Sequence, residues 1–333
     1  MRACIIRKYG NNDVLEYTNL QPEPTLHDHE ILVQMKAASV NPIDWKVMEG
    51  KAKMVLKYKF PLVLGNDGAG TVVKTGKDVT QFKIGDEVFF RPSKTRIGTF
   101  AEFCAVSEND AALKPKNLNF EEAAGIPLAG LTSWQALFDY GRLEKGQKVL
   151  IHAGSGGVGS LAVQFAKNAG AFTIATCSTR NIDLVKSLGA DQVIDYTKEK
   201  FTDILKDVDI VFDTIGGQAK YDSFKVMKPG GTLISIQSVP TPKSVKDYGL
   251  NPVVEMLLGI LSLKSYRYAR KYKVNYHYLF MKADGKQLNE IKNLIEEGKV
   301  KPVVDRVFNF DQIKEAFAYQ QTGRARGKII IRI

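Results

Sequence analysis

The sequence predicts an α/β protein in which a mainly β domain is combined with a doubly wound parallel sheet. Two observations predict this fold class. Residues 1 to about 120 contain short apolar or alternating runs separated by Gly, Pro, Asn and Asp, a pattern typical of strands and turns. From about residue 121 helical and strand patterns alternate, which indicates βαβ units and a parallel sheet. With 333 residues, 44% of them hydrophobic, the chain is long enough for two domains with sizeable cores.

The individual elements follow from hydrophobic periodicity. In the first part of the chain, ILVQMKAASV, GAGTVVKTG and DEVFFR have the composition of strands. Farther along we expect helices at 121–141, 160–170, 181–190 and 224–231, the last of which ends in a turn. We expect strands at 148–154, 172–178, 192–196, 209–217 and 232–238. An amphipathic helix at 285–298 and a closing strand at 327–333 complete the prediction.

Cysteine usage and hydropathy exclude several classes of protein. Cys4, Cys104 and Cys177 are odd in number and far apart, so they form neither a disulfide framework nor a CxxC zinc site. We expect each to be a small buried side chain. No apolar run approaches the ~20 residues needed to span a bilayer, and the first residues lack the apolar core of a signal peptide. The sequence therefore predicts a cytoplasmic protein.

The net charge of +11 suits nucleic acid, an anionic membrane surface or a phosphorylated ligand, and does not choose among them. The densest basic stretch is KSYRYARKYK at 264–273, where aromatic and basic residues alternate in a way that can stack bases. We favour a solvated helix face that carries its tyrosines toward the core, because no RNA-binding motif accompanies the stretch.

The run KVLIHAGSGGVGS at 148–160 has the order strand, glycine turn, helix. Glycines at this place let a pyrophosphate approach the backbone at a helix N-terminus, whose free N–H groups and dipole favour an anion. An ordinary strand-to-helix turn is the alternative, and four glycines within 154–159 make it the weaker one. The stretch therefore predicts a dinucleotide-binding turn.

The choice between NAD and NADP depends on the end of the next strand, where an acidic side chain would bind the ribose 2′-OH. The chain reads ATCSTRN there, with no Asp or Glu. Ser178, Thr179 and Arg180 instead offer hydroxyl groups and a guanidinium suited to a 2′-phosphate. Asp183 follows inside the next helix, where it is an N-terminal helix charge. These residues predict NADPH as the coenzyme.

Several segments together resemble a known family. They are VNPIDWKVMEG, FPLVLGNDGAGTVV, GDEVF, GIPLAGLTSWQAL, HAGSGGVGSLAVQFAK, CSTRNIDLVKSLGADQVIDY and RARGKIIIRI. The chain resembles zinc-independent members of the medium-chain dehydrogenase/reductase superfamily, in the quinone oxidoreductase and enone reductase branch. It is most similar to plant chloroplast quinone or enone oxidoreductases and to mitochondrial reticulon-interacting reductases.

The resemblance implies two domains with the active site in the cleft between them. A GroES-like catalytic domain would comprise residues 1–122, completed by about 300–333, and a Rossmann NADP-binding domain would comprise residues 123–299. Zinc-dependent relatives place a Cys where Asn41 stands and Gly-His-Glu where Gly65, Asn66 and Asp67 stand. Since these ligands are missing, the resemblance implies no metal. We interpret the four histidines as packing or surface residues: His27, His29, His152 and His277.

The resemblance also implies roles for individual residues. Asn41 and Lys46 are the catalytic candidates, as hydrogen-bond donors to a substrate carbonyl, and for Asn41 a turn-forming role before Pro42 is an equal alternative. Lys46 is also a candidate for binding the nicotinamide ribose. The further coenzyme-binding candidates are Thr132, Ser155, Gly156, Gly157, Val158, Ser178, Thr179, Arg180, Asn181, Tyr196, Ile215, Phe280, Met281 and Arg324.

The predicted function is NADPH-dependent hydride transfer to quinones or to the C=C bond of α,β-unsaturated carbonyl compounds, without zinc. The substrate is then a small enone, alkenal or quinone. The alternative is a nucleic-acid-binding or crystallin-like structural protein that retains an NADPH site, and an anionic membrane surface is a further candidate partner. We expect a homodimer, because relatives pair the edge strands of their Rossmann sheets and the apolar run at 276–281 suits such an edge.

Overall fold

The computed structural model describes residues 1–247 and 252–333, and the predicted α/β class is confirmed. The chain separates into two compact units. The first comprises Met1–Leu131 together with Lys282–Ile333, and the second comprises Thr132–Met281. The domain boundaries expected near residues 122 and 300 stay a prediction.

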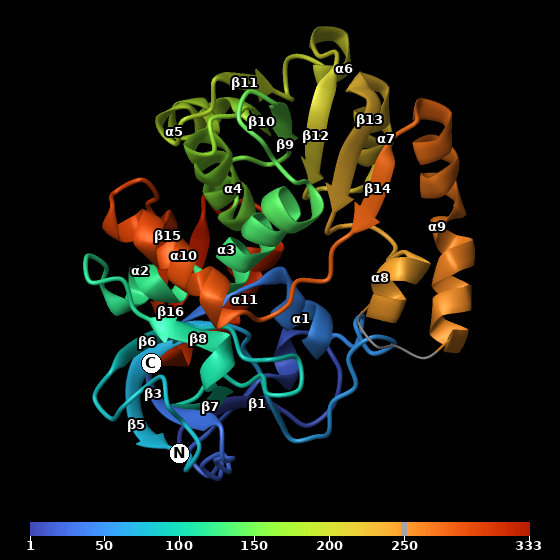
Figure 1. The fold of residues 1–333 in the computed structure, drawn as a ribbon. Helices are drawn as coiled ribbons and strands as arrows, with labels where there is room; N and C mark the ends of the chain where they lie inside the picture. The colour runs from blue at the N-terminus through green and yellow to red at the C-terminus, as the bar shows by residue number, and fades with distance from the viewer. Residues whose placement is uncertain (248–251) are drawn as a thin grey trace. The chain divides into compact units, whose positions relative to one another are not determined.

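The first unit is built around two sheets. A seven-stranded sheet has the order β15 (Val304–Asn309), β16 (Lys328–Arg332), β3 (Glu30–Val40), β5 (Gly68–Thr75), β6 (Glu87–Phe90) and β8 (Ala111–Leu113), with β7 (Phe103–Ser107) paired to β3. A three-stranded sheet has the order β2 (Glu16–Thr18), β1 (Ala3–Ile6) and β4 (Leu62–Val63). The last strand, β16, runs antiparallel to β3 and so joins the end of the chain to its beginning (Figure 1).

Helices and a shared core complete the first unit. The helices are α1 (Pro42–Met48), α2 (Phe120–Ala124), α10 (Gly285–Glu296) and α11 (Ile313–Gln321), with single 3₁₀ turns at Asn12–Val14, Glu108–Asp110 and Phe310–Gln312. The amphipathic helix expected at 285–298 is therefore confirmed. The core joins Ile31, Val33 and Phe90 from the sheet to Phe317 of α11, and all four side chains are fully buried. Burial on this scale fixes the C-terminal segment against the N-terminal strands.

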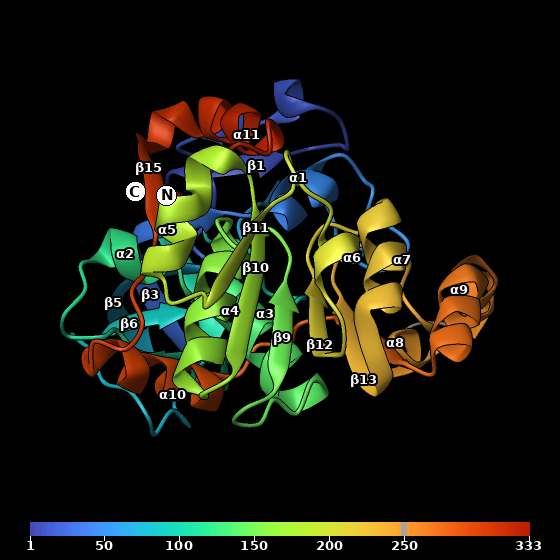
Figure 2. The ribbon, with the colours of Figure 1, turned by 90° about the horizontal axis from the view of Figure 1, so that it is seen from above.

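The second unit is a six-stranded sheet in which every neighbouring pair is parallel. Its order is β11 (Gln192–Asp195), β10 (Phe172–Cys177), β9 (Lys148–Ile151), β12 (Val208–Asp213), β13 (Met227–Ser235) and β14 (Asn275–Tyr278), most of which Figure 2 shows side by side. The chain proceeds outward from β9 through β10 to β11 and then returns to the other side of β9 at β12. This reversal is the switch point at which doubly wound sheets bind ligands.

Helices flank this sheet. They are α4 (Gly157–Asn168), α5 (Ile182–Ser187), α6 (Phe201–Ile204), α7 (Gly217–Val226), α8 (Pro242–Asp247) and α9 (Pro252–Tyr272), while α3 (Pro127–Trp134) crosses the boundary between the units. On one face, Leu150, Val211 and Leu233 pack with Phe224 of α7 and Ala269 of α9. No helix among the described residues is both long enough and apolar enough to cross a membrane.

Two predicted helices differ from the structure. The helix expected at 121–141 is divided, because α2 ends at Ala124 and Pro127 starts α3, which continues into a π-helical segment at Gln135–Tyr140. The helix expected at 224–231 ends already at Val226, and β13 begins at Met227. Pro229 lacks the N–H that a continuing helix requires, so the strand takes over these residues.

Three other predictions are confirmed. All three cysteines are buried. Residues 264–273 lie mainly in the last turns of α9, and the prediction for the tyrosines of this stretch holds for Tyr268 and Tyr272, which pack against the core of the second unit, whereas Tyr266 is 38% exposed. Asp183 lies in the first turn of α5, where its charge favours the helix N-terminus.

Candidate active site

Most of the predicted coenzyme-binding residues lie at one edge of the second unit. Each group follows the carboxyl end of a strand: Ser155–Val158 after β9, Ser178–Asn181 after β10, Tyr196 after β11, Ile215 after β12, and Phe280 with Met281 after β14. Since the strands are parallel, their carboxyl ends meet at the same edge. The fold therefore brings together residues that are far apart in the sequence.

The turn between β9 and α4 needs glycine for close packing. A Cβ on Gly159 would lie 2.1 Å from the carbonyl oxygen of Ala153, and a Cβ on Gly154 would lie 2.8 Å from the Cβ of Ala175. Ala153 itself has a left-handed backbone, with φ of 52°. Gly156 is the N-cap of α4, and a Cβ there would meet only the Ala153 oxygen, at 3.4 Å. The helix N-terminus is therefore held close to the sheet while Gly156 leaves its approach open.

Asn181 connects this turn to the residues expected to bind the 2′-phosphate. Its Nδ2 donates to the Oγ of Ser155 at 2.9 Å and to the Oγ of Ser178 at 3.3 Å. The Oδ1 of the same amide is buried and has no hydrogen-bond partner within the described part of the chain. A buried acceptor of this kind is costly unless a ligand satisfies it. The structure thus joins three predicted residues, Ser155, Ser178 and Asn181, by hydrogen bonds and leaves the Oδ1 of Asn181 as an unused acceptor.

Asp195, the last residue of β11, fixes the neighbouring turn. Its carboxylate accepts from the hydroxyl groups of Thr179 at 2.5 Å and Thr197 at 2.7 Å. These two hydrogen bonds lower the pKa of Asp195 below its usual value. They hold the Thr179 turn beside the segment that carries Tyr196, whose side chain is exposed. Asp195 was not among the residues predicted from the sequence, although an acid directly after an apolar strand run is the signal that marks it.

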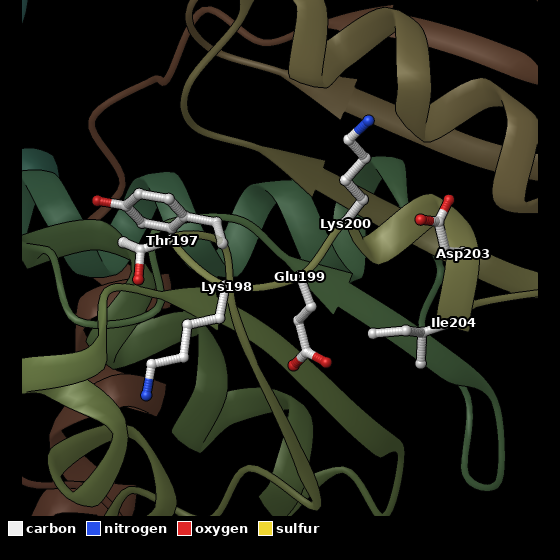
Figure 3. A pocket seen from close by; sticks show the side chains of 7 residues that line it. Thr197, Lys198, Glu199, Lys200, Asp203 and Ile204 are labelled. Atoms are coloured by element: carbon white, nitrogen blue, oxygen red, sulfur yellow. The ribbon is translucent and has the colours of Figure 1, made fainter.

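A shallow pocket of about 460 Å³ lies beside Tyr196. Its lining comes from the loop after β11 and from Asp203 and Ile204 of α6 (Figure 3). Lys198 and Lys200 line it together with Glu199 and Asp203. Because two cations are balanced by two acids, the pocket carries no excess positive charge that would select a phosphate.

Asp213, the last residue of β12, holds the loop that carries Ile215. Its Oδ1 accepts from the backbone N–H groups of Ile215 at 3.1 Å and Gly216 at 2.7 Å, and its Oδ2 accepts from Ser235 at 2.6 Å. The side chain of Ile215 is about half exposed. Asp213 is a second residue that the sequence analysis missed, and it too is an acid at the end of an apolar run.

His152, at the start of the glycine turn, is buried and links three elements. Its Nδ1 lies 3.1 Å from the Oγ1 of Thr176, and its Nε2 lies 2.9 Å from the Oγ of Ser223. Burial lowers the pKa of His152, which favours the neutral ring. The ring therefore serves packing, as the sequence predicted for this histidine.

Three predicted coenzyme-binding residues lie outside the turns after β9, β10, β11 and β12: Thr132, Phe280 and Arg324. Thr132 is buried in α3, and Phe280 lies after β14 with its ring centroid 4.9 Å from that of Tyr278. Arg324 belongs to the first unit, where it is exposed in the turn between α11 and β16. The described contacts do not connect these residues to the Asn181 group, so their coenzyme roles stay predictions.

Asn41 and Lys46 lie at the start of α1 in the first unit. Asn41 is the N-cap, Pro42 is the first helical residue, and the carboxylate of Asp44 accepts from the backbone N–H of Asn41 at 2.6 Å. This is the arrangement in which Pro and an N-cap residue begin a helix. Lys46 is half-buried, and burial, with a smaller contribution from Lys51, lowers the pKa of its ammonium group.

The side chain of Asn41 belongs to a buried polar cluster of six residues: Ser39, Asn41, Asp44, Asn66, Asp67 and Lys328. The Nδ2 of Asn41 donates to the Oδ1 of Asp67 at 2.8 Å and to the backbone oxygen of Ser39 at 3.2 Å. Its Oδ1 accepts from the Nζ of Lys328. Both ends of the amide therefore have partners inside the protein, which supports the structural alternative for Asn41. Its role as a substrate donor stays a prediction.

Charges inside this cluster are strongly affected by burial. Burial raises the pKa of Asp44 to about 7, even though Asn66 donates to its Oδ1 at 2.6 Å. Burial also lowers the pKa of Lys328, while the carboxylates of Asp67 and Asp44 oppose that shift. The lysine and the two acids therefore form one electrostatic unit in a region that excludes water.

Two family models match the chain. Residues 27–116 match the alcohol dehydrogenase GroES-like domain, and residues 188–331 match the zinc-binding dehydrogenase model. The NAD(P)H oxidoreductase RTN4IP1, mitochondrial, of Danio rerio is 37% identical over 100% of this chain and 91% of its own length. The chain belongs to the medium-chain dehydrogenase/reductase superfamily. Within it the chain falls in the zinc-independent quinone oxidoreductase and enone reductase branch, as the sequence segments indicated.

Two further members of the superfamily are similar along most of this chain. The NADPH-dependent alkenal/one oxidoreductase, chloroplastic, of Arabidopsis thaliana is 36% identical over 99% of this chain and 79% of its own length. The structure of the quinone oxidoreductase from Coxiella burnetii has a TM-score of 0.87 and 31% identity, covering 100% of this chain and 99% of the other. The chain is an oxidoreductase of the same architecture.

The buried cluster around Asn41 includes the positions at which zinc-dependent members of the superfamily bind zinc. Asn41, Asn66 and Asp67 stand where zinc-dependent members supply Cys, His and Glu, and the ammonium of Lys328 hydrogen-bonds to Asn41 within the same cluster. The amide oxygen of Asn41 already accepts from an ammonium group, and the carboxylate of Asp67 already accepts from Asn41 and Ser39, so both are poor candidates for zinc ligands. Within the described ranges, no three His, Cys, Asp or Glu side chains gather closely enough to hold a metal ion.

Proposed function

We propose that this protein is an NADPH-dependent reductase that delivers hydride to the C=C bond of α,β-unsaturated carbonyl compounds or to quinones, without zinc. The observation that carries the proposal is the polar group of Ser155, Ser178 and Asn181, which joins the glycine turn to the turn expected to bind the 2′-phosphate. The names of similar reductases support the same class of substrate.

The residues present fit a dinucleotide. The first turn of α4 begins with Gly157 and Val158, whose backbone N–H groups lack intrahelical acceptors and suit a pyrophosphate. Gly156 leaves the approach to them open. The buried Oδ1 of Asn181 is an acceptor for a ribose hydroxyl. Arg180, exposed in the 3₁₀ turn Thr179–Asn181, offers the guanidinium for a 2′-phosphate.

When bound, the reduced nicotinamide supplies a hydride for an electrophilic carbon of the substrate. The chain's own contribution at the substrate is a hydrogen bond from Lys46 to the carbonyl oxygen, where negative charge develops. The lowered pKa of Lys46 makes its ammonium group a stronger hydrogen-bond donor. A proton from water at the α-carbon then balances the hydride at the β-carbon, so that the C=C bond gains two hydrogens.

Coenzyme choice provides the test of this proposal. A guanidinium–phosphate contact contributes about 1.5–3 kcal/mol, which is roughly ten- to a hundredfold in affinity. Arg180→Ala should raise the KM for NADPH by that factor and leave the KM for NADH nearly unchanged, because NADH has no 2′-phosphate. Ser178→Asp should shift the preference further toward NADH. Lys186→Ala, an exposed cation on α5, is the matched control and should change neither value.

A panel of enones, alkenals and quinones completes the test. Consumption of NADPH with at least one of these compounds supports the proposal. A wild-type protein that prefers NADH contradicts the proposal. An equal rise in the KM for NADPH and for NADH in Arg180→Ala contradicts it as well.

We also propose a homodimer. β14 is one of the two edge strands of its sheet, as the run at 276–281 predicted, and an edge strand offers unpaired backbone groups to a second copy. Light scattering that gives a monomer mass over a wide concentration range contradicts this proposal. A cytoplasmic location stays a prediction from the sequence.

The nucleic-acid alternative loses support from α9. Tyr268 packs with Tyr221 and Phe224, and its ring centroid lies 4.8 Å from that of Tyr221. Tyr268 and Tyr272 therefore pack against the core of the second unit, which leaves Tyr266 as the exposed tyrosine of the stretch for base stacking.

A further inference from the structure

The outer face of α9 combines two kinds of exposed side chain. Between residues 256 and 263 of the helix, five large apolar side chains are between 43% and 63% exposed: Met256, Leu257, Ile260, Leu261 and Leu263. The following turns expose four basic side chains: Lys264, Arg267, Arg270 and Lys271. Together these nine residues are called the α9 outer face. Soluble surfaces rarely expose so many neighbouring apolar side chains without a partner.

Helical geometry places both groups on the same side of α9. Met256, Ile260, Arg267 and Lys271 follow one another at intervals of four, seven and four residues, which is one face of an α-helix. The opposite side of α9 is buried against the rest of the second unit. Its buried residues are Leu258, Ser262, Ser265 and Ala269. The helix is thus attached through one face, the residues of the α9 outer face are exposed, and α9 lies at the β14 end of the sheet (Figure 1).

The charge on this face is of one sign. Glu255, in the first turn, is the acidic residue of α9, and from there to the end of the helix the sequence contains none. No ion pair joins Arg267, Arg270 or Lys271 to a carboxylate among the described residues. The ammonium groups of Lys264 and Lys271 lie 4.2 Å and 5.2 Å from the ring centroids of Tyr221 and Tyr272, contacts that leave their positive charge without a carboxylate partner in the described part of the chain. Exposed aliphatic side chains beside cations of this kind are the composition of helices that lie in the interface of an anionic bilayer. The net charge of +11 is compatible with the same partner.

We propose that the α9 outer face docks on an anionic lipid surface. The five exposed apolar side chains of the α9 outer face enter the boundary between headgroups and acyl chains, and its four cations contact lipid phosphate or carboxylate groups. A second copy of this chain is the weaker occupant, for two reasons. The homodimer proposed above pairs the β14 edge, and five side chains over about two turns of α9 make a patch smaller than a stable dimer interface of its own requires. The cations of a second copy would also add like charges with no acid between them.

Vesicle flotation tests the proposal with the full-length protein. Vesicles of phosphatidylcholine alone are compared with vesicles that contain phosphatidylserine, at low and at high salt. We expect binding to the anionic vesicles only, weakened by salt. Removing three cations by Arg267→Gln, Arg270→Gln and Lys271→Gln should weaken binding about fivefold per charge, or roughly a hundredfold together. The apolar variant Leu257→Gln, Ile260→Gln, Leu261→Gln should weaken it at least tenfold.

Matched variants separate this face from general charge. Lys145→Gln, Lys186→Gln and Lys206→Gln remove the same number of exposed cations elsewhere on the second unit and should leave binding within twofold. A fluorescent dye at Ile260→Cys should shift to the blue on anionic vesicles, whereas a dye at Lys145→Cys should not, since the native cysteines are buried. Because all the substituted side chains are exposed, thermal unfolding should stay near that of the wild type.

Three outcomes overturn the proposal. The first is no binding of the wild type to anionic vesicles at low salt. The second is an equal loss of binding in the matched cation variant, which assigns the attraction to net charge. The third is an apolar variant that changes the mass in solution and leaves vesicle binding intact, which assigns the face to a second copy.

Discussion

Lys328 is the cation of the buried cluster around Asn41, and replacing it tests how that cluster is held together. Lys328→Met keeps much of the side-chain length and removes the ammonium. The Oδ1 of Asn41 then loses its donor, and the carboxylate of Asp67 loses the nearby cation that offsets its burial. Removing one partner of a buried charged group costs about 3–5 kcal/mol. For a domain of this size, the unfolding midpoint should fall by about 6–20 °C.

The loss should also depend on pH. The pKa of Asp44 is raised to about 7 from its usual 3.8, so between these values the folded state holds a proton that the unfolded chain has released. Stability from this group is therefore greatest below pH 4 and falls as the pH rises toward 7. At pH 8 both Asp44 and Asp67 lack a counter-charge in Lys328→Met, whereas at pH 5 Asp44 is protonated. The variant should lose more stability at pH 8 than at pH 5.

Calorimetry or circular dichroism at both pH values measures the effect. The double variant Lys328→Met, Asp67→Asn removes both charges and should recover part of the loss. Lys74→Met is the control, because it breaks an exposed ion pair with Glu23 and should cost less than about 1 kcal/mol. If Lys328→Met unfolds within 2 °C of the wild type at both pH values, the cluster is not the electrostatic unit described above.

Three further predictions concern the coenzyme edge and the metal. Gly159→Ala should weaken NADPH binding or lower stability by about 1–3 kcal/mol, because its Cβ meets the Ala153 oxygen at 2.1 Å; an unchanged titration and melt contradict this packing. Asn181→Ala should raise the Kd for NADPH about five- to tenfold by fluorescence titration, since it deletes the amide that joins Ser155 to Ser178. An unchanged Kd removes Asn181 from the site. Activity should survive strong chelators, and one equivalent of tightly bound zinc whose removal abolishes activity contradicts zinc independence.

Much of the fold was predictable because its signals are local. The glycine turn between an apolar run and a helical pattern identified β9 and α4, and the alternation that follows identified the parallel sheet. The helix expected at 224–231 was wrong because a hydrophobic pattern alone does not separate a helix end from a buried strand, and Pro229 marks the change.

The site was predictable only in part. Residues beside a glycine turn are marked by a local sequence pattern. Contacts between segments far apart in the chain have no such pattern in the sequence. Lys328 lies 287 positions from Asn41, and its hydrogen bond exists only because β16 pairs with β3. Asp195 and Asp213 act by holding loops in place, a role that depends on three-dimensional neighbours rather than on spacing. The exposed apolar half of α9 likewise required the structure, because it shows which helix face the second unit covers.

The most direct test of the proposed function follows the hydride itself. NADPH carrying deuterium at C4 of the nicotinamide, on either face in separate reactions, is incubated with the protein and a conjugated enone, and the product is analysed by NMR. The account predicts that one of the two labelled coenzymes places deuterium at the β-carbon, while solvent supplies the hydrogen at the α-carbon. Deuterium at the carbonyl carbon, which yields an allylic alcohol, or no transfer from either coenzyme to any enone or quinone tested, would contradict it.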